Sequence, residues 1–325
     1  MTQGSPTWNH LPPFFKQDIV GLLDYKSRCR LRLCSWTDRN IVDACPLLLK
    51  CVQFTTTTIY KPEVIHICLK DVSNRKIVSK TDCHSDVSRQ FLHLFHHQKS
   101  CCDVLKIDSL QRNNEQIEEW LRNLASQIRG TTSIMRIRAR KLVWKCDLVH
   151  GKVLADHLKH LDEKILEDIY IWKMPESFED AVSTNQWRNA RSIKIFHTCS
   201  IPIEHFLHVH QLLVRFDAFR PDDIWKLIQV FISENRPLQS YFFISSRKPI
   251  NPEEILNHFD VLPINDPVVA HQEEGDHTQR FRMATRENIF IVEIRKQSVF
   301  GAVCRVDHLP QDRLDNFYGS HKFYK

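Results

Sequence analysis

Strand-like segments alternate with helix-like segments along most of this 325-residue chain, and the interval between the strands restricts the fold more than any other feature. Candidate strands with alternating apolar residues begin about every 21 to 31 residues, at 104–110, 134–144, 165–172, 192–197, 213–219 and 240–245. Parallel neighbours in a sheet need a crossover of a dozen or more residues, and most of the intervening segments have a helical pattern. The spacing therefore favours a parallel sheet with helices between its strands.

Two of these helical segments carry clear apolar stripes. Residues 115–128 are followed by Gly130 as a stop signal, and their stripe consists of Ile117, Trp120, Leu121, Leu124 and Ile128. A second helix opens at Pro221, with the stripe Ile224, Leu227, Ile228 and Phe231. Leucine-rich-repeat proteins stack strand and helix units at the same interval. We therefore expect an α/β fold (α+β overall) with a curved, solenoid-like layer of alternating helices and strands, and a compact two-layer α/β sandwich is the alternative.

Shorter strand-like stretches flank this layer. Residues 52–60, 64–69 and 76–79 are rich in strand-forming residues and separated by turn residues, which predicts a small hairpin or meander at the edge of the larger domain. Residues 280–284, 288–295 and 299–306 lie at hairpin spacing and predict a C-terminal β meander. Such a meander would cap the open end of the layer, which repeat architectures need for solubility.

The first fifty residues predict three short helices. Pro12 and Pro13 suit a first helical turn, and apolar residues follow at helical spacing. Asp24 is placed to cap a second helix and Ser35 a third, with Asp38 in the position of a capping-box acid.

Composition and charge exclude several classes of protein. The chain is 42% hydrophobic and 26% charged, and it has no apolar run near the roughly 20 residues that span a membrane. Its seven glycines argue against a phosphate-binding glycine loop. The net charge of +6 is spread along the chain and is compatible with RNA or with an acidic protein partner. The N-terminus lacks the apolar block of a secretory signal, so we expect a cytoplasmic or nuclear protein without a membrane partner.

Cysteines and histidines form no strong ligand pattern. The eleven cysteines are odd in number and irregular in spacing, which favours reduced thiols. The densest group of candidate ligands lacks the paired spacing of structural zinc and consists of His93, His96, His97, Cys101 and Cys102. No nucleophile elbow or comparable catalytic motif occurs. We therefore expect no metal, no cofactor and no enzymatic activity.

The strand candidate at 134–144 contains a basic run. Alternation places Arg136, Arg138 and Arg140 on one face, and Ile137, Ala139 and Lys141 on the other. A row of three arginines is suited to bind phosphate or an acidic peptide, whereas a solvated outer face is the simpler interpretation. The three arginines are a candidate partner-binding face, and direct nucleic-acid binding is the less favoured use of it.

Residues 8–48 resemble an F-box, the three-helix module that docks a protein onto the Skp1 adaptor of a cullin ubiquitin ligase. The resemblance rests on Leu11-Pro12, the apolar stretch that ends at Leu22-Leu23-Asp24, and the basic and apolar run at 28–34. Matching the F-box pattern implies eight Skp1-binding residues: Leu11, Pro12, Ile19, Leu22, Leu23, Leu31, Leu33 and Cys34. Small modules bury surplus apolar surface against a partner, so we expect these eight to divide about evenly between self-packing and Skp1 contact.

Residues 101–259 resemble the FTH domain, an F-box-associated domain of unknown function in a large nematode F-box family, the F-box A family. The resemblance rests on Gln186-Trp187-Arg188-Asn189-Ala190-Arg191, the strand 192–196, Ile201-Pro202-Ile203-Glu204-His205-Phe206 and Asp222-Asp223-Ile224. Trp187 and Phe206 are more often core residues than a binding site in such a context.

Together the two resemblances imply a substrate-recognition adaptor of an SCF-type (Skp1-cullin-F-box) E3 ubiquitin ligase. The F-box would bind a Skp1-like adaptor and through it a cullin, while the α/β domain would bind a target protein. The alternative is a non-degradative adaptor, for example for an RNA-binding protein. We expect an F-box at 5–50, a β-rich connecting segment with the first helix at 51–100, an FTH-like domain at 101–265, β-strands at 280–306 and a tail at 307–325.

Overall fold

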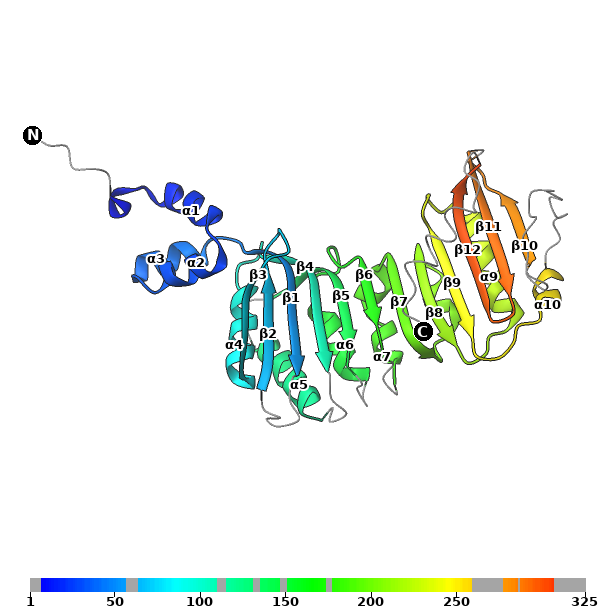
Figure 1. Ribbon diagram of the computed structural model, residues 1–325, viewed down its shortest axis with the longest axis horizontal. Coiled ribbons are helices and arrows are strands. Elements are labelled where there is room, and N and C mark those ends of the chain that lie inside the picture. Colours follow the sequence, from blue (N-terminus) through cyan, green and yellow to red (C-terminus); the bar gives the residue numbers. More distant parts are fainter. Residues whose placement is uncertain are drawn as a thin grey trace, which may run out of the picture. The chain divides into compact units, whose positions relative to one another are not determined.

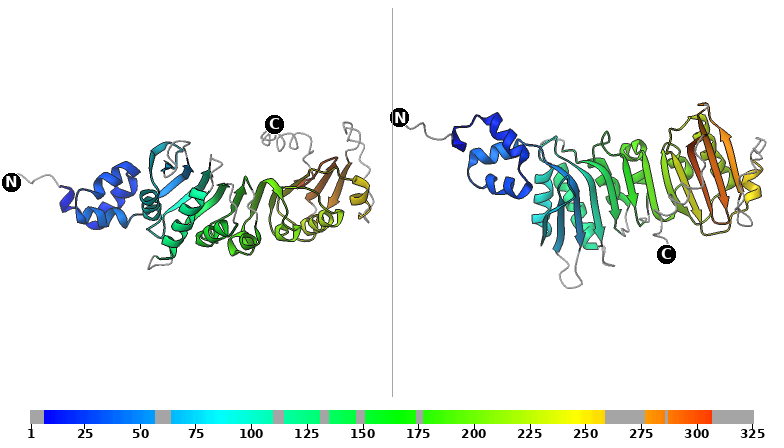
Figure 2. Two further views of the ribbon diagram at one scale, coloured as in Figure 1. Left: turned by 90° about the horizontal axis from the view of Figure 1, so that it is seen from below. Right: turned by 45° about the horizontal axis from the view of Figure 1, so that its top comes forward.

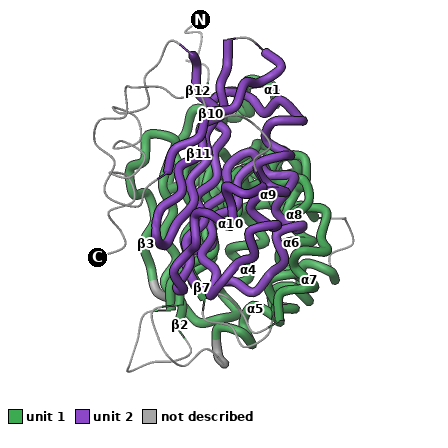
Figure 3. Tube along the Cα trace, turned by 90° about the vertical axis from the view of Figure 1, so that its right-hand side faces the viewer, with its two compact units in different colours: residues 1–190 green, residues 191–325 purple. Residues whose placement is uncertain are grey.

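The computed structural model describes residues 7–56, 64–109, 115–130, 135–146, 151–173, 177–258, 277–285 and 287–306. The expected tail at 307–325 lies outside these residues. The chain divides into two compact units, residues 1–190 and residues 191–325, which have different colours in Figure 3.

Unit 1 begins with short helices: η1 (Trp8–His10), α1 (Pro13–Leu22), α2 (Tyr25–Arg32) and α3 (Trp36–Asp43) (Figure 1). We call this segment, residues 8–46, the N-terminal module. The three predicted α-helices are therefore confirmed, and so are two caps. The Asp24 carboxylate accepts the Ser27 N–H at 2.7 Å, and the Ser35 hydroxyl accepts the Asp38 N–H at 3.0 Å.

The N-terminal module has a small apolar core. Its buried members are Val20, Ile41, Val42 and Cys45, and Trp8, Leu23 and Leu31 pack against them. Burial of a large apolar side chain stabilises by about 1.5–3 kcal/mol, whereas ordering one residue costs about 1–2 kcal/mol of backbone entropy. A module of this length therefore depends on polar contacts in addition to its core.

Six strands form the sheet of unit 1, in the order β6-β5-β4-β1-β2-β3. Their bounds are β1 (Leu48–Thr56), β2 (Val64–Lys70), β3 (Lys76–Cys83), β4 (Cys101–Ser109), β5 (Arg138–Lys145) and β6 (Asp168–Ile171). Strands β1, β4, β5 and β6 are parallel neighbours, while β2 and β3 add an antiparallel hairpin at the other edge of β1. The predicted parallel strands and the predicted edge hairpin are both present.

Helices cover one side of this sheet (Figure 2). They are α4 (His84–Leu94), α5 (Glu115–Arg129) and α6 (Gly151–His160), and the short helices α7 (Glu179–Val182) and α8 (Asn185–Asn189) follow β6. All five residues of the predicted α5 stripe are buried. Trp120 from this stripe packs on Phe54 of β1 with ring centroids 5.5 Å apart, and its indole N–H donates to Ser88 Oγ of α4 at 2.9 Å. We call the opposite side of the sheet the open face.

Unit 2 contains six strands, which are neighbours in the order β7-β8-β9-β12-β11-β10. Its strands are β7 (Ser192–Cys199), β8 (Gln211–Phe216), β9 (Tyr241–Ser246), β10 (His277–Arg282), β11 (Asn288–Arg295) and β12 (Ser298–Arg305). The first three are parallel, and the antiparallel meander of the last three joins the edge of β9 through β12. The helices are η2 (Ile203–Phe206), α9 (Pro221–Ser233) and α10 (Pro252–Leu256).

Aromatic packing joins α9 to this sheet. The Phe231 ring of α9 lies 5.3 Å from the Phe242 ring of β9 and 5.4 Å from the Phe290 ring of β11, measured between centroids. Gly301 of β12 sits against the same cluster, because a Cβ atom there would lie 2.4 Å from the Phe242 ring. The predicted stripe of α9 is buried in this core.

The architecture is therefore α/β, with a helical N-terminal stretch followed by a mixed region in which helices connect parallel strands, as the strand interval predicted. In the described ranges, no helix combines the length and the apolar character needed to cross a bilayer.

Candidate protein-interaction surfaces

An apolar surface is exposed on the N-terminal module. Among the described residues, ten large hydrophobic side chains are exposed, and six of them lie between Phe14 and Trp36. On α1, Phe15, Ile19 and Leu22 share one helix face at spacings of four and three residues, and Leu22 is 89% exposed. A concentration of exposed apolar side chains on a 40-residue segment is typical of a protein-binding site.

The other face of α1 belongs to the module's own core. Val20 is fully buried, and Lys16 is 7% exposed with its Nζ 5.5 Å from the centroid of the Trp8 ring. The Trp8 indole N–H donates to Asp38 Oδ1 at 2.7 Å, which joins η1 to α3. Helix α1 is thus apolar on two sides, and the described residues of the chain cover only one of them.

The eight residues predicted to bind Skp1 divide between these two environments. Leu23 and Leu31 pack against the core of the module. Leu11 is half-buried, and the remaining five are exposed: Pro12, Ile19, Leu22, Leu33 and Cys34. Sequence reasoning did not include Phe14, Phe15 and Trp36, which are exposed by 59%, 51% and 72%. The sequence did contain a signal for these three residues, because the module has more large apolar side chains than a core of its size can bury.

Arg28 of α2 is a buried cation that joins three parts of the module. Its guanidinium donates to the carbonyl oxygens of Leu23 at 3.1 Å, Pro46 at 2.8 Å and Gly21 at 3.0 Å. Burial lowers the pKa of this guanidinium, since the charged form is removed from water. The end of α1, helix α2 and the segment before β1 therefore depend on one side chain.

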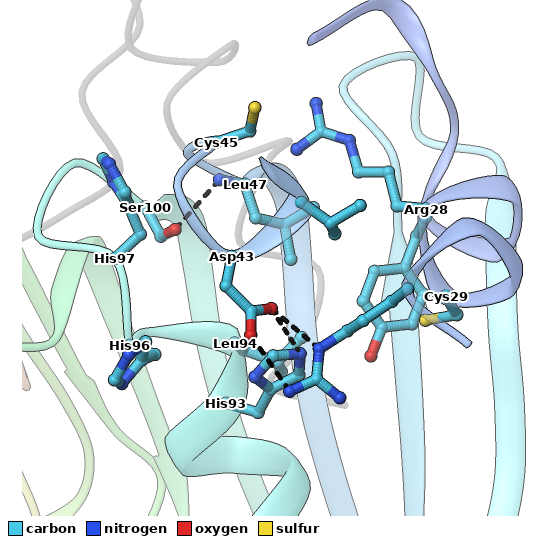
Figure 4. A pocket seen from close by; sticks show the side chains of 13 residues that line it. Arg28, Cys29, Asp43, Cys45, Leu47, His93, Leu94, His96, His97 and Ser100 are labelled. Atoms are coloured by element: carbon cyan, nitrogen blue, oxygen red, sulfur yellow. Dashed lines mark hydrogen bonds and ion pairs between the residues drawn. The ribbon is translucent and has the colours of Figure 1, made fainter. Parts of the chain in front are cut away.

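A pocket lies where the N-terminal module meets the strand and helix layer of unit 1 (Figure 4). In this pocket Arg32 of α2 binds Asp43 of α3 through two contacts, Nε to Oδ1 at 2.7 Å and Nη2 to Oδ2 at 3.1 Å. His93 Nε2 of α4 lies 3.9 Å from the same Oδ1. One carboxylate therefore contacts side chains from α2 and α4.

The electrostatics of this junction favour neutral His93. Burial lowers the His93 pKa, and the neighbouring Arg32 lowers it further, although Asp43 opposes them. Two hydrogen bonds donated by backbone N–H groups continue the junction, from the Leu47 N–H to the Ser100 hydroxyl oxygen and from the Cys101 N–H to the Leu47 carbonyl, each at 2.9 Å. The start of β1 is thereby joined to the start of β4.

Arg136, which precedes β5, and Arg138 and Arg140 of β5 show the predicted alternation. Ile137 and Ala139 are buried, while Arg136, Arg138 and Arg140 are at least partly exposed. Their charges are partly compensated: Arg138 Nε lies 3.7 Å from Asp162 Oδ2, and Arg140 Nε lies 3.9 Å from Glu167 Oε1. The Arg136 guanidinium donates to the Lys159 carbonyl.

The prediction that Lys141 lies on the same face as Ala139 is wrong. The next buried residue on the helix-covered side is Leu142, three positions after Ala139, so the strict alternation is interrupted between them. Lys141 consequently lies on the open face, with its Nζ 3.4 Å from the centroid of the Tyr170 ring.

Charged side chains of alternating sign lie on neighbouring strand segments at the level of this interruption. Lys50 Nζ lies 2.7 Å from Asp103 Oδ2, and Arg140 contacts Glu167. Asp103 and Arg140 occupy equivalent positions in the parallel register of β4 and β5. Each lies between two residues that pair directly with the other strand. Four successive strand segments therefore carry a positive, a negative, a positive and a negative residue at one level.

The distinctive Gln186-Trp187 segment is a packing element, as predicted for its tryptophan. Trp187 is fully buried, and its ring lies 5.2 Å from the Phe178 ring. The Gln186 amide donates to the Leu161 carbonyl at 2.8 Å. Phe206 is also fully buried, in unit 2. These residues belong to the cores of the two units.

The candidate metal ligands named from the sequence do not converge in the described part of the chain. There, three ligand atoms come within 4.8 Å of one another only in Asp82, Cys83 and Asp86, a partly exposed group at the start of α4. The Cys83 thiol donates to Asp86 Oδ2 within this group. All eleven cysteines lie in the described part of the chain, and none of them forms a disulfide.

Two family models match the chain. Residues 8–50 match the F-box domain, and residues 133–262 match the FTH domain. A search of curated proteins and a search of solved structures found no match. The F-box match coincides with the helices that expose the apolar surface, and the FTH match includes the buried Gln186-Trp187 segment.

Proposed function

We propose that this chain, which contains an F-box domain and an FTH domain, is the substrate-recognition subunit of an SCF-type E3 ubiquitin ligase. Its F-box would dock a Skp1-like adaptor and through it a cullin, and its α/β layer would bind a target protein. The chain would act by proximity, because it raises the local concentration of the target near a ubiquitin-charged enzyme. We place it in the nematode F-box A family, in the cytoplasm or the nucleus.

The observation that carries this proposal is the exposed apolar face of the N-terminal module. Ile19, Leu22 and Leu33 are exposed by 39%, 89% and 78%, although water-exposed leucines on a small helical module are unfavourable unless a partner covers them. The Skp1-binding residues would then be Pro12, Ile19, Leu22, Leu33 and Cys34, with Leu11 at their edge. Phe14, Phe15 and Trp36 extend the same surface.

The test is binding of the full-length chain to purified Skp1, measured by biolayer interferometry. We expect Leu22→Glu and Leu33→Glu each to weaken binding by at least about tenfold, because a buried interface position does not accept an unpaired carboxylate. Both side chains are exposed in the free chain, so the fold should remain intact. The matched control is Leu238→Glu, a substitution at a leucine of unit 2 that is 40% exposed.

Two results separate the alternatives. If both module variants bind Skp1 as the unmodified chain does, the docking assignment fails. If Skp1 binding depends on these leucines but the half-life of captured target proteins is unchanged when the chain is deleted, the chain is a non-degradative adaptor. That result would retain the docking surface and reject the ligase role.

A further inference from the structure

The open face of the unit 1 sheet presents its side chains in rows across the strands. The parallel register places Cys51, Val104, Lys141 and Asp168 in one row, Gln53, Lys106, Val143 and Tyr170 in the next, and Thr55, Asp108 and Lys145 in a third. Lys70 of β2 lies opposite Cys51. Trp172 follows β6 and is joined to β5 by a hydrogen bond from its N–H to the Trp144 carbonyl at 2.9 Å.

Cations outnumber anions on this face. The lysines are Lys70, Lys106, Lys141 and Lys145, whereas the acidic residues in the same rows are Asp108 and Asp168. Lys106 Nζ lies 3.0 Å from Asp108 Oδ2, so these two charges compensate one another.

Lys141 and Lys145 contact aromatic rings. Lys141 Nζ lies 3.4 Å from the centroid of the Tyr170 ring, and Lys145 Nζ lies 3.6 Å from the centroid of the Trp172 ring. A ring stabilises a cation and holds it in place but does not neutralise it. Burial lowers the Lys145 pKa and the nearby Lys106 lowers it further, whereas Asp108 opposes them.

The spacing of the two lysines matches an extended polypeptide. They are four residues apart on one strand, which is about 13 Å at roughly 3.3 Å per residue. Two carboxylates four residues apart on an extended partner segment have the same separation. Val143 lies between the lysines and beside Tyr170, so the intervening residue of the partner would meet an apolar surface.

The same geometry disfavours nucleic acid as the occupant. Bases bind single-strand readers by stacking on aromatic faces, but Lys141 and Lys145 already occupy faces of Tyr170 and Trp172.

We propose that the open face of unit 1 binds an acidic, extended segment of the target protein, with Lys141 and Lys145 paired to carboxylates four residues apart. This assignment rests on the proposed function, in which the α/β layer receives a target, and it names the chemistry of that target. The candidate row Arg136, Arg138 and Arg140 is distinct, because its guanidiniums contact Lys159, Asp162 and Glu167.

The test uses the full chain and a labelled poly-L-glutamate probe at low salt, with binding followed by fluorescence anisotropy. We expect the double variant Lys141→Gln with Lys145→Gln to weaken binding by about tenfold, since two ion pairs are lost. The matched control is Lys152→Gln with Lys164→Gln, which removes the same charge from exposed positions of unit 1 outside the rows and should change binding less than twofold. Equal weakening by the two double variants would overturn the proposal.

A labelled single-stranded RNA homopolymer is the competing probe. Tighter binding of RNA than of poly-L-glutamate, lost in the Lys141 and Lys145 variant, would replace the acidic protein segment by nucleic acid. Skp1 binding of the same variant should equal that of the unmodified chain. If the chain binds Skp1 but its binding of poly-L-glutamate does not depend on Lys141 and Lys145, this inference alone is refuted. If poly-L-glutamate binding depends on the two lysines but the chain does not bind Skp1, the proposed function alone is refuted.

Discussion

Replacing Arg28 with methionine tests whether one buried guanidinium stabilises the N-terminal module. Three charge-assisted hydrogen bonds would be lost, to the carbonyl oxygens of Leu23, Pro46 and Gly21. Net contributions of about 1–1.5 kcal/mol for each of the three bonds give a destabilisation of about 3–4.5 kcal/mol, even if water reaches some of the freed carbonyls. This is comparable to the whole stability available to a segment with four buried apolar residues. Arg28→Met should therefore unfold the module locally.

The assay is amide hydrogen exchange read by mass spectrometry, with peptides from the N-terminal module compared with peptides from α5. In Arg28→Met, exchange of the module should approach the unfolded rate, while α5 keeps its protection because its core is separate. Arg28→Lys should give an intermediate result, because a lysine ammonium cannot match the geometry of three donors. Arg30→Met is the control, since Arg30 is an exposed neighbour on the same helix. Unchanged protection of the module in Arg28→Met would refute the reasoning.

Two further predictions concern the cores of the two units. His157 of α6 is buried and donates to the Leu121 carbonyl at 2.9 Å, and burial lowers its pKa from 6.5 to about 4. The unfolded chain therefore binds the proton first, so stability should fall by about 3 kcal/mol as pH drops from about 6.5 to about 4, and urea titrations of His157→Gln should lack this component. In unit 2, Gly301→Ala should lower the free energy of unfolding by about 1–3 kcal/mol, because the new Cβ meets the buried Phe242 ring. Gly21→Ala, with no atom near its Cβ, should leave thermal unfolding unchanged or slightly raised, and a large loss at Gly21 or none at Gly301 would contradict these packing arguments.

The elements that sequence reasoning predicted best are those with strong local signals. Helix α5 was placed almost to the residue, because its apolar stripe has helical period and Gly130 follows it. The caps Asp24 and Ser35 were also predicted, since capping depends on residues three positions away. Strand β4 begins at Cys101, earlier than the candidate strand predicted. Its first residues pair with the neighbouring β1, and this pairing cannot be seen in the apolar pattern of β4 itself.

The features that were missed depend on tertiary contacts. Arg28 looks like any basic residue in a basic run, and only the folded module brings three carbonyl oxygens to it. The position of Lys141 was wrong because a local interruption of alternation changes which face a residue occupies. The lysine rows could not be predicted, since they combine residues from β2, β4 and β5 that are far apart in the sequence.

The charges of Lys50, Asp103, Arg140 and Glu167 alternate in sign from one strand segment to the next. Loss of an even number of strand and helix units from unit 1 would therefore keep opposite charges adjacent, whereas loss of an odd number would not. Deletion of the single unit that contains β4 and α5 would bring Lys50 beside Arg140, two like charges. Removal of two consecutive units would bring Lys50 beside Glu167 and restore an attractive pair. Each exposed pair contributes less than about 1 kcal/mol, so the effect is a bias on how such a layer lengthens or shortens by duplication and deletion.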